Sequence, residues 1–134
     1  MKVKPVGPPA LVAVLLLLSA VPVFAHHGAA SYDVSKMTTL KGAVTSVQWI
    51  NPHVEVDIDV TNSTGAAEKY VVESVSPLGL SRNGWTKDSV KPGDQITVTG
   101  NLSKNGTRVL RLKKIVFATG REYTIQSGED YAGQ

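Results

Sequence analysis

Three histidines are the residues of this sequence with the most specific chemistry, and two of them are adjacent. His26 and His27 follow a hydrophobic stretch in "VFAHHGAASYD", residues 23–33, and His53 opens a segment of alternating residues. Imidazole is the commonest metal ligand in proteins, and a free α-amino group can lose its proton on binding a metal. If the chain is cut before His26, the new amine and the His26 imidazole offer two nitrogens to one ion.

Copper is the metal predicted for such a site, because nitrogen-rich tetragonal arrangements suit Cu(II), which also leads the affinity order of the divalent metals. We predict that His26 and His53 bind copper, with His27 as a further or alternative ligand. Glu73 is the candidate carboxylate ligand or partner of a ligand. The alternative is a solvated arm for His26 and His27, with His53 and Glu73 in ordinary strand contacts and ion pairs.

A second group of candidate binding residues is aromatic and consists of Trp49, Tyr70 and Trp85. Aromatic rings stack on bases and sugars, so on an exposed barrel face they would recognise a glycan, a peptide or a partner protein. The alternative is that the three rings fill the core and dock the helix, since small barrels need bulky side chains inside.

Motifs for catalysis are absent from the sequence. It has no Gly-x-Ser-x-Gly elbow, phosphate loop or zinc-protease helix. The acidic residues Glu55, Asp57 and Asp59 occupy alternate positions, as expected for the solvent face of a strand rather than for a catalytic pair. The chain has no cysteine, so a metal site must use histidine, carboxylate or the terminal amine. We therefore expect a binding module rather than an enzyme.

Residues 1–25 resemble a secretory signal peptide. Lys2 and Lys4 precede an apolar run at residues 10–21, and Val23 and Ala25 occupy the positions that a signal peptidase reads. The run is short for a membrane span, which needs roughly 20 apolar residues. We expect cleavage after Ala25, with a cut after Ala30 as the alternative, and a periplasmic protein without a stable membrane span.

Charge gives little support for nucleic acid as a partner. Removing residues 1–25 removes two lysines and no acid, which leaves 12 basic and 11 acidic residues. A metal ion or a periplasmic protein is therefore the expected partner.

The rest of the chain alternates short strand patterns with turn signals, which is typical of a small all-β barrel. Strands are expected in five segments: residues 40–50, 53–60, 68–75, 95–102 and 107–117. A short helix is expected within residues 76–85, where Ser76 can cap it and Pro77 can open it. A shift of the apolar phase predicts a bulge near Lys113 and Lys114.

Three strands, a short helix and two further strands follow the order of the five-stranded OB-fold barrel. We therefore predict an OB-like β-barrel domain over residues 39–126. An N-terminal arm at residues 26–38 precedes it, and a tail at residues 127–134 follows it.

Five segments in order resemble the DUF6152 family of small exported bacterial proteins of unknown function: "AHHG", "TLKGAV", "QWINPH", "SPLGLSRNGWTKDSVKPGD" and "ITVTG". The resemblance covers nearly all of the chain from His26 to about Phe117. It implies an exported, periplasmic protein with a small β-barrel, and it implies no activity.

Overall fold

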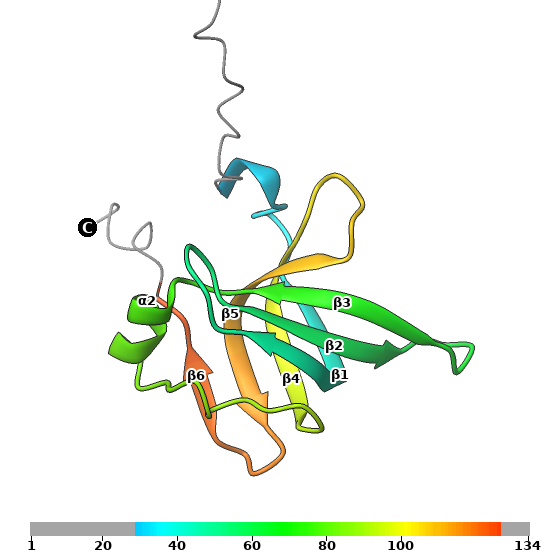
Figure 1. Ribbon diagram of the computed structural model, residues 1–134. Coiled ribbons are helices and arrows are strands. Elements are labelled where there is room, and N and C mark those ends of the chain that lie inside the picture. Colours follow the sequence, from blue (N-terminus) through cyan, green and yellow to red (C-terminus); the bar gives the residue numbers. More distant parts are fainter. Residues whose placement is uncertain (1–28, 127–134) are drawn as a thin grey trace, which may run out of the picture.

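A computed structural model describes residues 29–126 (Figure 1). The elements in chain order are η1 (Ala29–Ser31), β1 (Thr38–Gln48), β2 (Glu55–Thr61), β3 (Ala67–Glu73), α2 (Pro77–Arg82), β4 (Gln95–Leu102), β5 (Val109–Phe117) and β6 (Glu122–Thr124). The all-β prediction is confirmed, and the short helix lies between the third and fourth strands as expected.

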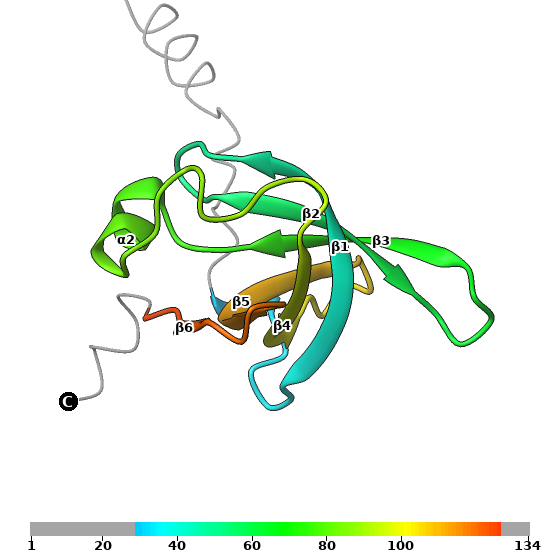
Figure 2. The same ribbon diagram turned by 90° about the horizontal axis from the view of Figure 1, so that it is seen from below.

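The first five strands close into a barrel. β1 pairs with β2 and β4, β2 pairs with β3, and β4 pairs with β5, all antiparallel. The parallel pairing of β3 with β5, from Val71 opposite Val109 to Glu73 opposite Arg111, closes the ring. Figure 2 shows α2 at one side of this barrel, with the β2–β3 hairpin extending away on the other side. This is the OB-like arrangement predicted from the element order.

The interior follows from the alternation along β2. Val56 and Ile58 are buried, as is Val54 just before the strand, because alternate side chains of a strand share one face. Leu80 of α2 and Leu110 of β5 are also fully buried, which joins helix and barrel in one hydrophobic core.

The predicted bulge lies at Lys113. Thr99 is opposite Lys114 and Gly100 is opposite Leu112, so Lys113 is the extra residue of β5. Its carbonyl accepts a hydrogen bond of 2.7 Å from the Ile125 backbone N–H. The bulge thereby holds the segment that follows β6 against β5. The sequence patterns did not predict the strand β6.

The helix lies within the expected residues 76–85. The Ser76 hydroxyl accepts a hydrogen bond from the Gly79 N–H, and Pro77 is the first helical residue, as predicted. The helix ends at Arg82 because Gly84 turns the chain with a φ of +83°, and the Trp85 N–H then bonds back to the Leu80 carbonyl.

Candidate functional site

His53 lies just before β2, beside the end of β3, and its side chain is 40% exposed. Its Nδ1 lies 3.1 Å from the Ser74 carbonyl oxygen. Because a carbonyl only accepts hydrogen bonds, Nδ1 carries the proton, and in the neutral ring the lone pair is on Nε2. That Nε2 lies 4.0 Å from Oε1 of Glu73.

Glu73 ends β3 and is held among charged groups. It is opposite Glu55 of β2 and opposite Arg111 of β5. Like charges directly opposite each other on neighbouring strands are destabilising, so a cation near Glu73 and Glu55 is favourable. Arg111, which is opposite Glu73 on β5, supplies positive charge there.

Tyr32 approaches the same carboxylate from the N-terminal side. It is 4% exposed, it lines a cavity together with Glu73, and the Arg111 guanidinium carbon lies 5.8 Å from its ring centroid. Sequence patterning had placed Tyr32 in a polar arm, because one aromatic residue in a polar segment makes no periodic pattern. We call Tyr32, His53, Glu55, Glu73 and Arg111 the His53 cluster.

Residues 31–37, which we call the strap, cross one end of the barrel and are held there by hydrogen bonds. The Asp33 N–H bonds to the Leu102 carbonyl at 2.9 Å, and the Ser31 carbonyl accepts a bond of 3.0 Å from the Lys104 N–H. Nδ2 of the buried Asn101 donates to the carbonyls of Asp33 and Lys36, each at 3.0 Å. Packing of the barrel therefore begins within the expected arm, before β1.

The environment of Tyr32 predicts a loss of stability at alkaline pH. Burial, followed by the nearby Glu73 carboxylate, raises the pKa of Tyr32 far above its ordinary value. The unfolded chain ionises this phenol near pH 10 while the folded chain keeps it protonated, so its contribution is full below about pH 10 and is lost as the pH rises. The free energy of unfolding should fall more steeply above pH 10 in the wild type than in Tyr32→Phe, by up to about 1.4 kcal/mol per pH unit.

Urea denaturation at several pH values between about 9 and 11 measures both slopes. Comparing slopes rather than absolute stabilities removes the constant cost of deleting the hydroxyl. Lysine titration is common to both proteins, so parallel slopes would show that Tyr32 ionises equally well in the folded chain.

The His53–Glu73 pair presents two donors to a cation. A separation of 4.0 Å is about twice a typical metal–ligand bond of about 2.0 Å, so both atoms can contact one ion from opposite sides. Residues 29–126 contain no group of three or more histidine, cysteine or acidic side chains placed to hold a metal. Further donors would have to come from His26 and His27, which lie outside the described residues.

A cavity of about 340 Å³ lies beside Glu73, between the strap and the loop that joins β4 to β5. Its walls include Ser31, Tyr32, Glu73, Ser103 and Thr107. The Glu73 carboxylate therefore lies near His53 and also lines this cavity beside the strap.

Asp57, in the acidic row of β2, forms an ion pair with a lysine and is not part of the His53 cluster. The Lys69 ammonium lies 2.8 Å from Oδ2 of Asp57, and the Ser46 hydroxyl donates to the same oxygen at 2.9 Å. The hydrogen bond from Lys69 holds the pKa of Asp57 below its usual value. Asp57 is thus engaged by a lysine, and its burial departs from the solvent-facing position expected of it.

The three candidate aromatic residues are not brought together on one face. Trp85 is 3% exposed and packs against Phe117 and Tyr123, and Trp49 packs against the core. Tyr70 lines a separate cleft of about 620 Å³, where the Arg108 guanidinium carbon lies 6.0 Å from its ring centroid. An exposed platform of three rings is therefore not formed.

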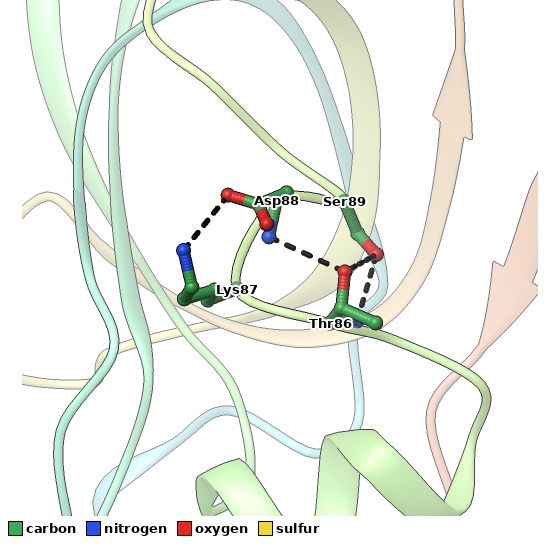
Figure 3. Close-up of polar contacts among 4 residues, drawn as sticks. All are labelled: Thr86, Lys87, Asp88 and Ser89. Carbon is green, nitrogen blue, oxygen red and sulfur yellow. Dashed lines mark hydrogen bonds and ion pairs between the residues drawn. The ribbon is translucent and has the colours of Figure 1, made fainter.

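The turn at residues 86–89 is polar, but its side chains and N–H groups bond mainly to one another (Figure 3). The Thr86 N–H donates to the Ser89 hydroxyl at 2.8 Å, and the Asp88 N–H donates to the Thr86 hydroxyl at 3.3 Å. Lys87 pairs with Asp88 at 3.3 Å. These bonds stabilise the turn and engage the polar groups that could otherwise bind a ligand.

Neither helix within residues 29–126 has the length and apolar character that a membrane crossing needs.

Solved structures that match this chain include the mitochondrial single-stranded DNA binding protein Rim1 from S. cerevisiae. Its identity is 13% over 62% of this chain and 93% of that chain, with a TM-score of 0.49. A ZRD-deleted mutant of TiaS in complex with agmatine is 26% identical over 69% of this chain and 25% of its own, with a TM-score of 0.47. No curated protein matches the sequence. Residues 13–111 match the family of unknown function DUF6152, and the chain belongs to that family.

Proposed function

We propose that this protein is exported, is cut after Ala25 and binds copper in the periplasm. The ligands are the new α-amino group and imidazole of His26 together with His53, with His27 as a further or alternative ligand. Glu73 serves as the carboxylate beside His53.

The arrangement of His53 and Glu73 is the observation that carries this proposal. The Ser74 carbonyl holds Nδ1 at 3.1 Å, which orients the ring and leaves Nε2 as the donor in the neutral form. Metal-binding histidines commonly have their second nitrogen held in this way by a backbone carbonyl or a carboxylate. The Glu73 oxygen at 4.0 Å supplies negative charge on the side where an ion would bind.

The strap supports a contribution from the N-terminus. Tyr32 and Glu73 line one cavity, and His26 lies six residues before Tyr32. Six residues of extended chain span up to about 20 Å, so the N-terminal nitrogens can reach His53. The amine, one or two imidazoles from the N-terminus and His53 form the nitrogen-rich set that Cu(II) favours.

Protein that begins at His26 can be compared with the same protein after acetylation of its α-amino group. We expect one tight Cu(II) site in the first, and an affinity lower by at least about tenfold in the second, because the acetylated nitrogen can no longer bind the ion beside the His26 imidazole. Calorimetry gives affinity and stoichiometry, and electron paramagnetic resonance counts the bound nitrogens.

The intact mass of the exported protein is the control for processing. A first residue of His26 is expected, whereas a first residue of Ser31 removes both N-terminal histidines and rules out the proposed site. Equal copper affinity in the two forms would also contradict the proposal.

A further inference from the structure

The outer edge of β3 is open over the first part of the strand. β3 pairs with β2 along its whole length, from Ala67 to Glu73, but with β5 only from Val71 to Glu73. No strand within residues 29–126 pairs with residues 67–70 on that side. The β2–β3 hairpin extends away from the barrel here (Figure 2).

The backbone groups of Ala67 and Lys69 point to this open edge. In an antiparallel pair, successive residues alternate between bonding to the partner strand and pointing away from it. The Val71 N–H points away from β2, because it bonds to the Arg108 carbonyl at 2.9 Å. Lys69 and Ala67, two and four residues earlier, therefore present an N–H and a carbonyl each in the same direction.

The cleft of about 620 Å³ that contains Tyr70 lies along this edge. Its walls include Lys69 and Tyr70 of β3, Leu102 at the end of β4, and Arg108 of the loop that joins β4 to β5. An added strand beside the first half of β3 would lie in this cleft, in line with β5, which occupies the rest of the same edge.

The two faces of the edge differ in chemistry. Tyr70 and Leu102 are partly buried and pack against the core, so the inner face offers apolar contact. Lys69 faces the other way, because alternate side chains of a strand point to opposite faces. Its ammonium pairs with Asp57, but its side chain is 61% exposed and is open to a second carboxylate. The cleft is lined by two basic side chains and one acidic side chain, which leaves an excess of positive charge.

A second copy of the chain fits this edge poorly. In an antiparallel pair, only residues whose backbone groups point outward can bond to each other. A two-fold pairing centred on Lys69 places two lysines opposite each other, and one centred on Glu68 does the same with two glutamates, which is destabilising. A pairing centred on Ala67 needs Gly65, where the chain turns with a φ of +83°. The edge therefore suits a strand of different sequence.

We infer that the open edge of β3 binds an extended segment of a partner protein as an added strand, with apolar side chains toward Tyr70 and acidic side chains toward Lys69. Main-chain hydrogen bonds give such a complex its affinity, and pockets for alternate side chains give it specificity. The inference does not depend on copper, because none of the residues at this edge belongs to the His53 cluster.

A capped peptide of alternating glutamate and valine, seven residues long, is the probe. Added to metal-free, isotope-labelled protein, it should shift the amide NMR signals of Ala67 and Lys69 to saturation and slow their hydrogen exchange, because both N–H groups gain partners. The same peptide with lysine in place of glutamate should bind at least about fivefold more weakly. Equal binding of the two peptides, or shifts that spare these two amides, would overturn the inference. Shifts of these amides on raising the protein concentration alone would show self-pairing and would also overturn it.

Methylated peptides test the strand geometry without altering the protein. One alternate set of N–H groups of an added strand faces β3, and the other set faces away. A peptide methylated on its glutamate nitrogens and one methylated on its valine nitrogens should therefore differ in affinity by at least about tenfold, because only one of them loses the bonds to β3. Similar affinities would show that the peptide does not add as a strand.

Lys69→Pro tests the same bond from the side of the protein. It removes the outward N–H, and proline is accepted on an edge strand where that N–H faces solvent. Binding of the glutamate–valine peptide should weaken by at least about tenfold. Lys69→Ala is the matched control, because it keeps the N–H, loses only the charge and should weaken binding by about fivefold at most. Equal affinities of the two variants would contradict the inference, and if Lys69→Pro fails to fold, the methylated peptides still decide it.

Discussion

Gly100→Ala is expected to lower the free energy of unfolding by about 3 kcal/mol or more, at the upper end of what overpacking a core costs. Gly100 is buried in β4 beside the bulge. An added Cβ would overlap the Arg111 carbonyl oxygen and would lie 2.8 Å from both the Arg111 carbonyl carbon and a Leu110 methyl group. Because the Arg111 atoms belong to the backbone of the neighbouring strand, β4 and β5 would have to separate beside Arg111, the residue of β5 that is also opposite Glu73 of β3.

Thermal and urea unfolding measure this effect. A loss of about 3 kcal/mol lowers the melting temperature of a domain of this size by roughly 12 °C or more. Thr99→Ala, at the preceding residue, is the control, because its hydroxyl makes an exposed hydrogen bond of 2.9 Å with the Thr39 hydroxyl, whose loss should cost about 1 kcal/mol or less. A Gly100→Ala protein as stable as this control would show that β4 can shift without penalty.

Much of the fold could be predicted because its signals are local. The strict alternation at residues 53–60 identifies the buried face of β2, and the change of apolar phase in β5 identifies the bulge at Lys113. The cap at Ser76 and the turn at Gly84 are equally local. These features depend on neighbouring residues, so a single sequence is sufficient to find them.

The strand β6 could not be predicted, because its reason lies elsewhere in the chain. Three residues, Glu122–Thr124, are too few to show a period. They form a strand because β5 offers an edge beyond the bulge, where Lys114 is opposite Thr124 and pairs with Glu122 at 2.9 Å. Tertiary pairing thus overrides a weak local preference.

The candidate site likewise contains residues that the sequence predicts and residues that only the tertiary structure brings in. The sequence predicts Glu73 as a carboxylate ligand or the partner of a ligand, and the β2–β3 register brings it opposite Glu55, with its Oε1 4.0 Å from Nε2 of His53. Arg111 joins only through the parallel closure of β3 on β5, and Tyr32 joins only because the strap crosses the barrel. Both contacts link positions far apart in sequence, which no local pattern reveals.

His53→Ala is expected to reduce the Cu(II) affinity of protein beginning at His26 by about 100-fold or more, since removing a ligand should cost at least as much as removing the group that orients one. That change corresponds to about 2.7 kcal/mol of binding free energy. The number of nitrogens seen by electron paramagnetic resonance should also fall, because the amine and imidazole of the N-terminus would remain without the barrel nitrogen.

Two further variants define how the barrel contributes. Glu73→Gln should weaken binding by about tenfold while keeping the nitrogen count, because it removes charge beside His53 and leaves the ring held by Ser74. Asp59→Asn removes a charge farther along the same face of the sheet and should leave the affinity within about twofold, since exposed charges farther apart than about 10 Å are largely screened. If His53→Ala binds copper as tightly as the wild type, and only blocking the amine abolishes binding, then copper binds to the N-terminus alone and the barrel contributes no ligand.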